Sequence, residues 1–197
     1  MNRQEIFSNI YRNGLWNNSR SDIPRSGPGS SLVNTIKFRE FFDTFCEANA
    51  IESVLDIGCG DLTWMPLTKT FQTKKYTGID IVKSLIDSHI TKYPQHTFLC
   101  LDAVAQDIPS ADVICIRDVL FHLSIEDIQT LLGKLRCKYL FATSCRNSSN
   151  TNTLQSNKCC FHLINLRLKP FEMTNFIRSI YEPEFDRDVL IFQLNTN

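Results

Sequence analysis

The sequence has no excess of either charge and no long apolar run. It contains 21 Lys and Arg residues against 21 Asp and Glu residues, so its formal net charge is zero. An extended nucleic-acid surface needs basic residues to neutralise phosphates, so this balance disfavours a nucleic-acid partner. No apolar run approaches the roughly 20 residues that cross a bilayer, and the N-terminal stretch MNRQEIFSNIYRNG lacks the apolar block of a signal peptide. We therefore predict no membrane partner and a cytoplasmic location.

The eight cysteines include no CxxC pair. They make up about 4% of the chain, below the density of a disulfide scaffold, and most lie in apolar runs, so we expect free, buried thiols in a reducing compartment. Cys145, Cys159, Cys160 and His162 are the one set that could gather around zinc. Their spacing lacks the paired knuckles of a zinc site, so we predict no metal.

The length of 197 residues and the hydrophobic share of 43% favour a single domain. We divide residues 1–197 into an N-terminal helical and loop cap (1–50) and a core (51–197) that contains a variable loop (145–174). Short apolar runs alternate with amphipathic stretches along the core, and this alternation is typical of βαβ units. The predicted strands are 53–58, 75–80, 97–102, 111–118, 138–144, 175–183 and 188–194, and the predicted helices are 3–12, 32–50, 62–71, 81–92 and 124–136. The fold class is thus α/β, a doubly wound, Rossmann-like, seven-stranded and mostly parallel sheet that ends in an antiparallel hairpin.

The most informative stretch is VLDIGCGDLTWM (54–65), in which an apolar strand runs into a glycine turn. Gly58 and Gly60 allow the backbone to approach a ligand closely. The third glycine of a nicotinamide-type motif is missing, because Leu62 and Thr63 stand there, so close binding of a pyrophosphate is disfavoured. Asp56, two residues before the first glycine, would also repel a pyrophosphate but suits a cationic ligand.

Three further predicted strands end in a carboxylate. These are Asp80, Asp102 and Asp118, in the runs KYTGID, TFLCLD and VICIRD. The carboxyl edge of a doubly wound sheet lines the ligand crevice. A single Asp at such a position commonly caps a helix or forms a turn, but a row of acids in register indicates a ligand site.

With these residues the sequence resembles the class I S-adenosylmethionine-dependent methyltransferases, over about residues 50–145. DIGCG (56–60) is similar to their glycine-rich first motif, from which Leu62 departs. The segments SRSDIPRSGPGSS (19–31), CGDLTWM, GIDIV and RDVLFHLS resemble a smaller branch, some of which acts on sugar or other small-molecule hydroxyls. The resemblance implies the cofactor S-adenosyl-L-methionine and a Rossmann-like methyltransferase fold.

The resemblance also assigns roles to individual positions. Asp80 would bind both ribose hydroxyls with Ile81 packed on the adenine, and Asp102 would accept from the adenine amino group beside the Ala103 backbone. Other expected cofactor-binding residues are Asp56 near the sulfonium, the turn glycines Gly58 and Gly60, Trp64 near the methyl donor, and Arg117 or Arg20 at the cofactor carboxylate. Core packing is an equally good interpretation of Trp64.

A hydroxyl acceptor requires a base near neutral pKa. Asp118 and His122 are four residues apart, so they would share a face if a helix begins there, and we predict them as the catalytic pair. His162 is the second candidate base.

The absence of certain motifs reduces the number of plausible acceptor classes. The sequence has no [DN]PP[YFW] motif, no Pro-Cys nucleophile and no basic cluster along one helix. We expect methyl transfer to a hydroxyl of a sugar, a glycan or another small molecule. The alternatives are a protein or RNA methyltransferase and a catalytically silent nucleotide-binding module of a larger enzyme.

Overall fold

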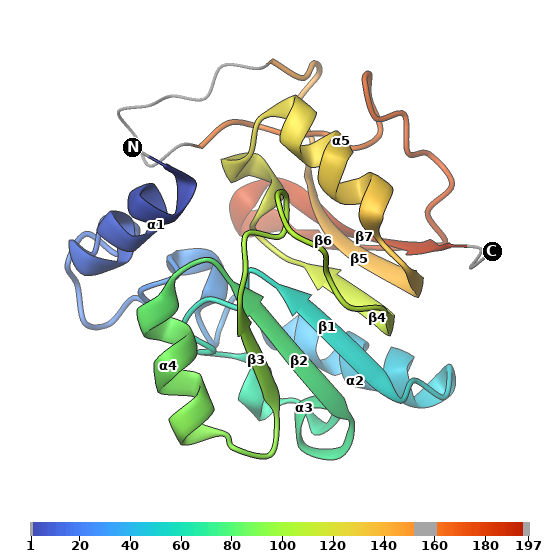
Figure 1. Cartoon of the computed structure of the whole chain (residues 1–197). Coiled ribbons are helices and arrows are strands. Elements are labelled where there is room, and N and C mark those ends of the chain that lie inside the picture. The colour runs from blue at the N-terminus through green and yellow to red at the C-terminus, as the bar shows by residue number, and fades with distance from the viewer. Residues whose placement is uncertain (1, 152–160, 195–197) are drawn as a thin grey trace. The chain divides into compact units, whose positions relative to one another are not determined.

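The protein is described from a computed structural model that covers residues 2–151 and 161–194 (Figure 1). The chain folds into two compact units, Met1–Ala103 and Val104–Asn197. Each unit is described by itself. The organisation as one domain stays a prediction.

The first unit contains three parallel strands and four α-helices. In chain order these are α1 (Arg3–Arg12), α2 (Ile36–Ala48), β1 (Ser53–Ile57), α3 (Lys69–Thr73), β2 (Lys75–Asp80), α4 (Lys83–Lys92) and β3 (Thr97–Cys100). β2 lies between β1 and β3 and pairs in parallel with both. Parallel strands bring their carboxyl ends to one edge, so the segments that follow β1, β2 and β3 lie together there.

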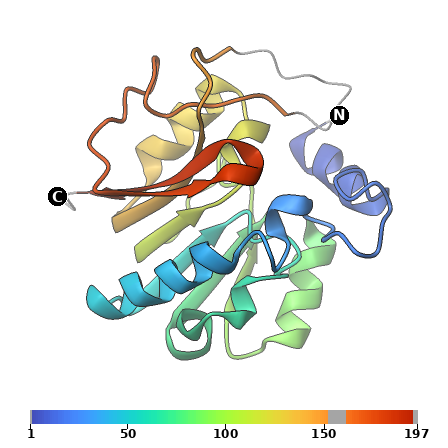
Figure 2. The same cartoon turned by 180° about the vertical axis from the view of Figure 1, so that it is seen from behind.

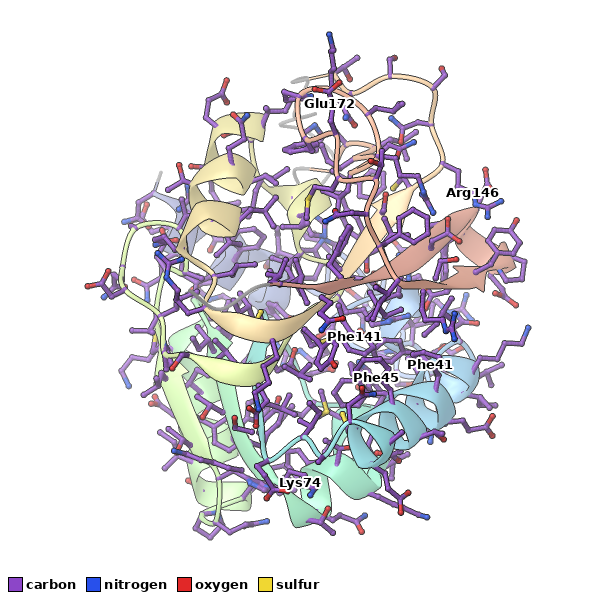
Figure 3. All side chains as sticks on the ribbon, turned by 90° about the vertical axis from the view of Figure 1, so that its right-hand side faces the viewer. Phe41, Phe45, Lys74, Phe141, Arg146 and Glu172 are labelled. Atoms are coloured by element: carbon purple, nitrogen blue, oxygen red, sulfur yellow. The ribbon has the colours of Figure 1, made fainter. Side chains whose placement is uncertain are left out.

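The first unit buries the apolar face of α2. Phe38, Phe42 and Cys46 recur at helical spacing and are each at most 1% exposed. Figure 2 shows α2 lying in front of the strands when the molecule is seen from behind. Phe41 and Phe45 stack on each other along the same helix, with ring centroids 5.9 Å apart (Figure 3).

Over its described residues, 104–151 and 161–194, the second unit contains four strands and one α-helix. These are β4 (Ala111–Ile116), α5 (Ile125–Lys134), β5 (Cys137–Cys145), β6 (Arg178–Glu182) and β7 (Arg187–Gln193). β4 and β5 are parallel, whereas β7 is antiparallel to both β5 and β6. Ser124 caps α5 by accepting from the Asp127 N–H at 3.1 Å, as the acidic first turn of that stretch leads one to expect.

Seven strands follow the order β3-β2-β1-β4-β5-β7-β6. All seven predicted strands are present, and β6 and β7 form the predicted terminal hairpin, with β7 as the antiparallel strand. The predicted fold class, a mostly parallel seven-stranded Rossmann-like sheet, is confirmed.

One predicted helix is wrong. Residues 62–71 form a turn, a short 3₁₀-helix (Met65–Leu67) and only then α3. Leu62 has a positive φ of 53°, which is incompatible with an α-helix, and Pro66 interrupts the segment. Trp64 therefore does not open an α-helix.

Three sequence-based expectations concern cysteines, membranes and metal ions. Six cysteines in the described residues are free, and five of them are buried, whereas Cys159 and Cys160 lie outside the described residues. Of the helices in the described part of the chain, none is both long and apolar enough to cross a bilayer. The described residues also hold no group of three or more His, Cys, Asp or Glu side chains that could bind a metal ion.

Candidate active site

The glycine turn after β1 is held against β2. Gly58 N and Cys59 N donate to the Ile79 carbonyl oxygen at 2.8 and 3.0 Å. Gly58 and Gly60 have positive φ values of 74° and 59°, a region in which glycine avoids the clash of a side chain. The sequence DIGCG thus makes the tight strand-to-turn passage that its glycines predict.

Asp80, at the end of β2, ties this turn to the start of α4. Its Oδ2 accepts from Gly60 N at 3.0 Å and its Oδ1 accepts from Val82 N at 2.9 Å. The side chain is buried, and burial raises the pKa of Asp80 although both backbone bonds lower it. Each carboxylate oxygen has two acceptor positions, so the two backbone donors leave capacity for one more donor on each oxygen.

His89 completes the support of the turn. From the last turn of α4, its Nε2 lies 2.7 Å from the Gly60 carbonyl oxygen, and the ring is 5% exposed. Asp80 therefore binds the N–H of Gly60, and His89 contacts the carbonyl oxygen of the same residue. The sequence offered one signal for His89, a histidine on the buried face of a predicted helix, and that signal alone does not distinguish support of a loop from core packing.

Asp56 lies within β1 and is 4% exposed. Its Oδ2 accepts from the Tyr76 hydroxyl at 2.7 Å. Tyr76 lies in β2 and is 1% exposed, so its hydroxyl and the Asp56 carboxylate satisfy each other inside the first unit. The expected position of Asp56 near a sulfonium stays a prediction.

Asp102 and Ala103 follow β3 in a turn, two residues beyond the strand end. Asp102 Oδ2 pairs with Arg3 Nη1 at 2.5 Å. Ile81, directly after Asp80, packs at the edge of a cluster formed by Tyr11, Val82 and Leu85. The first unit therefore brings together the glycine turn, Asp80 with Ile81, and Asp102 at the carboxyl ends of adjacent strands, as the sequence predicted.

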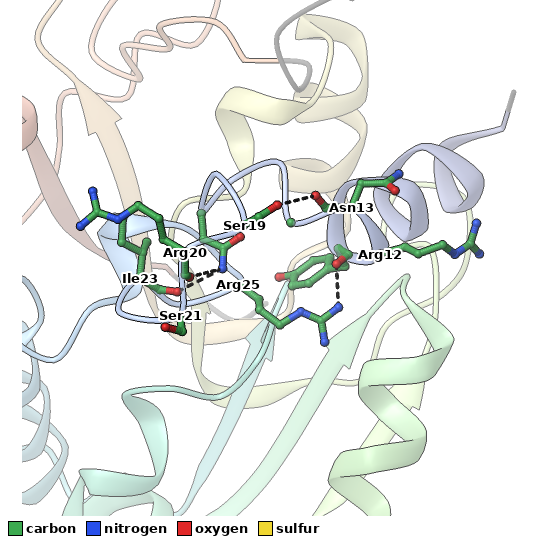
Figure 4. Close-up of a pocket in the computed structure, with 10 residues that line it drawn as sticks. Arg12, Asn13, Ser19, Arg20, Ser21, Ile23 and Arg25 are labelled. Atoms are coloured by element: carbon green, nitrogen blue, oxygen red, sulfur yellow. Dashed lines mark hydrogen bonds between the residues drawn. The ribbon is translucent and has the colours of Figure 1, made fainter.

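Trp64 and Arg20 have other surroundings. Trp64 is 8% exposed and meets Phe38 of α2 edge-on, with centroids 5.2 Å apart, which favours core packing. Arg20 makes a two-point ion pair with Asp22, through Nε at 3.0 Å and Nη2 at 2.5 Å, and its side chain is 60% exposed. Arg20, Arg12 and Arg25 are among the residues that line a pocket of about 500 Å³ between residues 11 and 25 (Figure 4).

The residues after β4 form a dense ion-pair network in the second unit. Arg117 donates to Asp118 at 3.1 Å and to Glu182 at 2.6 Å, and Arg187 donates to the same two carboxylates at 2.9 and 2.7 Å. Thr143 Oγ1 donates to Asp118 Oδ1 at 3.1 Å. Burial raises the pKa of Asp118, but the two arginines and Thr143 lower it by more, so the net shift is downward. Asp118 is thus held as a carboxylate.

The predicted pair of Asp118 and His122 does not lie on one helix face. Asp118 has a φ of 63°, and His122 ends a 3₁₀-helix (Leu120–His122) that precedes α5. The His122 ring is half-buried and meets the Phe121 ring edge-on, with centroids 4.8 Å apart. The helix that would have aligned the two side chains begins only at Ile125, because Asp118 takes a left-handed backbone conformation.

His162, the second candidate base, is 5% exposed. Nδ1 lies 2.9 Å from the Thr151 carbonyl oxygen and Nε2 lies 2.7 Å from the Leu123 carbonyl oxygen. Nδ1 thus joins two parts of the 145–174 loop, and Nε2 joins that loop to the segment before α5. This ring has a structural role in the loop, which the sequence pattern alone did not reveal.

The comparisons with known proteins agree with this geometry. Residues 55–140 match the family described as methyltransferase domain. No curated protein sequence matches the chain significantly.

Solved structures show the fold of the whole chain. The magnesium protoporphyrin IX methyltransferase ChlM from Synechocystis PCC 6803 with bound SAM is similar with a TM-score of 0.64 and 14% identity, over 97% of this chain and 96% of that one. The N-methyltransferase NodS from Bradyrhizobium japonicum WM9 in complex with S-adenosyl-L-homocysteine has a TM-score of 0.63 and 14% identity, over 95% and 97%. An O-methyltransferase family protein from Burkholderia thailandensis has a TM-score of 0.58 and 11% identity, over 86% and 58%.

Residues 55–140 are thus similar to a methyltransferase domain, and the chain has the Rossmann-like fold of solved methyltransferases, two of which hold S-adenosylmethionine or S-adenosyl-L-homocysteine.

Proposed function

We propose that this protein is an S-adenosylmethionine-dependent methyltransferase that transfers the methyl group to a hydroxyl of a sugar, a glycan or another small molecule, and that the carboxyl ends of β1, β2 and β3 bind the cofactor. The observation that carries the cofactor site is the geometry of Asp80. Its two oxygens are fixed by Gly60 N and Val82 N, and each keeps one acceptor position for a hydroxyl donor.

The hydrogen-bond acceptors at this edge of the strands match the donors of the cofactor. A ribose diol and an adenine amine present hydrogen-bond donors, and Asp80 and Asp102 present carboxylate acceptors at the ends of neighbouring strands. Ile81 offers an apolar contact for a planar base, and the turn with Gly58 and Gly60 allows close backbone approach. In our proposal, Asp56 and Trp64 complete the wall on the methyl-donor side.

The cofactor supplies an already activated methyl group on a sulfonium, so the protein mainly aligns donor and acceptor. The remaining chemical task is to take the proton from the acceptor hydroxyl. We assign this to His122, because the two arginines keep Asp118 ionised with a lowered pKa, which makes that carboxylate a weak base at neutral pH. Asp118 then acts by fixing the segment that carries His122.

Four arginines of the second unit support a small acceptor over RNA. Arg117, Arg146, Arg167 and Arg187 all pair with the carboxylates of Asp118, Glu182 or Asp188. Figure 3 shows Arg146 at the end of β5, where it also stacks over the Tyr181 ring at 4.2 Å. Guanidinium groups bound in this way are not free to neutralise phosphates.

The predicted cofactor carboxylate partners need a separate test. Arg20 and Arg117 already have carboxylate partners, Asp22 for the first and Asp118 and Glu182 for the second. Of the two, we propose Arg20, because its pair with Asp22 is exposed and costs little to exchange. A cytoplasmic location remains part of the proposal and is supported by the six free thiols among the described residues.

The deciding experiment is a methyl-transfer assay with isotope-labelled S-adenosylmethionine. The acceptor panel contains glycosides, phenols, peptides and RNA, and mass spectrometry locates the label. We expect label on a hydroxyl of a glycoside or phenol. Label on RNA or on a peptide would refute the acceptor proposal, and cofactor binding without transfer to any acceptor would favour a silent module.

A further inference from the structure

Helix α1 begins on the residues that we assign to adenine binding. Arg3 Nη1 donates to Asp102 Oδ2 at 2.5 Å, and Gln4 Nε2 donates to the Ile81 carbonyl oxygen at 3.1 Å. A capping box fixes the start of the helix, because Asn2 Oδ1 accepts from Glu5 N at 2.9 Å and Asn2 N donates to Glu5 Oε2 at 3.0 Å. The first turn therefore reaches Asp102 and Ile81 in a defined register.

The next turns of α1 pack on the junction between β2 and α4. Tyr11 forms a buried cluster with Val82 and Leu85, and Phe7 and Ile81 pack against that cluster. Phe7 and Tyr11 are four residues apart on one helix face, so α1 presents a continuous apolar stripe to this junction. This packing holds the helix over the segment that follows Asp80.

A second anchor connects the N-terminal segment to the glycine turn. Ser26 N donates to Asp61 Oδ2 at 3.0 Å, and Asp61 N donates to Ser26 Oγ at 2.9 Å. Ser26 Oγ also lies 2.7 Å from the Tyr11 hydroxyl. Residues 3–26 thus contact all three loops of the proposed cofactor site, at Gly60 and Asp61, at Ile81 and Val82, and at Asp102.

We propose that the first turn of α1 is a gate to the adenine subsite, in which Arg3 and the adenine amino group compete for the carboxylate of Asp102. Cofactor binding breaks the pair of Arg3 and Asp102 and releases the first turn, while the anchor of Tyr11, Ser26 and Asp61 keeps the segment attached. This inference rests on the proposed function, because it uses the assignment of Asp102 to the adenine amine. It names Arg3 as the residue that sets cofactor affinity from outside the glycine motif.

The physical reason for the competition is space. The Arg3 guanidinium lies against Asp102 Oδ2, where in our proposal the adenine amino group has to approach, and its charge-assisted bond must be broken to admit the amine. The pair is partly exposed, with side chains 27% and 21% accessible, so breaking it lowers the folding stability only slightly. The anchor has two reciprocal backbone-to-side-chain bonds and a buried tyrosine, so it is the more durable end of the segment.

The test is calorimetric binding of S-adenosyl-L-homocysteine to the whole chain and to its variants. Arg3→Ala is expected to bind about 3- to 10-fold more tightly than the wild type, since a partly exposed pair contributes roughly 0.5–1.4 kcal/mol. Arg136→Ala is the control, because Arg136 is an exposed arginine of the second unit whose Nη1 donates to the Gly133 carbonyl oxygen at 3.1 Å. Its affinity should equal that of the wild type, and thermal melts confirm that both variants are folded.

Hydrogen exchange supplies a readout that does not depend on activity. Amides of residues 3–7 should exchange faster when S-adenosyl-L-homocysteine is bound, whereas amides around Ser26 should not. Cys100 is a second reporter, because its Sγ lies 3.7 Å from Gln4 Nε2, so Arg3→Ala should speed its alkylation relative to Arg136→Ala.

The outcomes separate the gate from the proposed function. Unchanged or weaker binding by Arg3→Ala, with the wild type binding normally, overturns the gate and leaves the cofactor site intact. Slower exchange of residues 3–7 in the complex also overturns it, since α1 would then close on the cofactor. If the wild type binds no S-adenosyl-L-homocysteine, the assignment of the cofactor site fails, and the gate fails with it.

Discussion

The carboxylate of Asp80 accepts a hydrogen bond from the backbone N–H of Gly60 at 3.0 Å, across 20 residues of sequence. This bond joins the glycine turn after β1 to the acid at the end of β2. It means that Asp80 both shapes the turn and offers its remaining acceptor capacity to a ligand. The first three predictions follow from this pair of residues and from what surrounds it.

Replacing Asp80 by alanine should abolish cofactor binding. The variant loses two charge-assisted bonds to the ribose, each of about 1.5–3 kcal/mol, so we expect at least about 100-fold weaker binding of S-adenosyl-L-homocysteine by calorimetry. Asp87→Ala is the control, because Asp87 is on α4 and forms an exposed ion pair with Lys83 of the same helix. Near-normal affinity in Asp80→Ala would contradict the assignment.

As the pH is lowered, cofactor affinity should begin to fall at a higher pH than it would if the pKa of Asp80 had its ordinary value. Burial raises the pKa of Asp80, and only the ionised form accepts from both ribose hydroxyls. The dissociation constant should therefore rise as the pH drops through that raised pKa, above the ordinary value of about 3.9. Calorimetry at pH values from about 8 to about 4.5 tests this, and a flat profile over that range would count against it.

The raised pKa of Asp80 acts on folding stability in the opposite direction: cofactor affinity should rise with pH, whereas the contribution of Asp80 to stability should fall. Between the ordinary and the raised pKa of Asp80, the folded protein keeps a proton that the unfolded chain has lost, so this group destabilises the fold as the pH rises through that window. Asp80→Asn removes this contribution. Urea unfolding against pH should show that the wild type loses more stability than Asp80→Asn on going upward through the window.

Gly60→Ala should destabilise the protein by about 1–3 kcal/mol. An added Cβ would lie 2.3 Å from Ser26 Oγ, at a residue whose φ is 59°. The double variant Gly60→Ala with Ser26→Gly should recover the steric part but not the backbone part, and Ser26→Gly alone serves as the reference. Urea unfolding measures all three, and full additivity of the two single changes would show that the residues do not clash.

Asp118→Asn should cost about 3 kcal/mol or more of folding stability. It leaves Arg117 and Arg187 with one carboxylate between them, and a buried charge that loses its partner is expensive. Because the pKa of Asp118 is lowered, its contribution is present above the ordinary Asp pKa and is lost as the pH falls through the lowered value. Asp22→Asn, which disrupts the exposed pair with Arg20, should cost less than about 1 kcal/mol.

His122→Gln should lower kcat by about 100-fold or more while cofactor affinity stays the same. General-base catalysis contributes about 10²–10⁴ in rate, and glutamine keeps the size of the side chain but cannot take a proton. The measurement pairs turnover on the acceptor found in the panel with calorimetry of S-adenosyl-L-homocysteine. A kcat within a few-fold of the wild type would show that His122 is not the base.

Local pattern predicted most of the elements but failed where a single backbone angle intervenes. The strands were correct because period-2 and apolar patterns are local, and the capping residues of α1 and α5 are visible in sequence. Residues 62–71 were wrong as a helix because Leu62 adopts a positive φ, which a leucine does not indicate in sequence. The helix face that Asp118 and His122 would share if a helix began there is absent, because Asp118 also has a positive φ.

The candidate site also has a part that local sequence pattern predicts and a part that depends on tertiary packing. The sequence by itself determined the α/β class and the acids at the ends of β1, β2 and β3, because parallel strands place consecutive strand ends at one edge. Only the tertiary structure decided that Asp118 is bound by two arginines, that Ser26 occupies the space over Gly60 and that Arg3 bonds to Asp102. The last contact joins residues 99 positions apart, and such contacts depend on how whole elements pack, which no local pattern encodes.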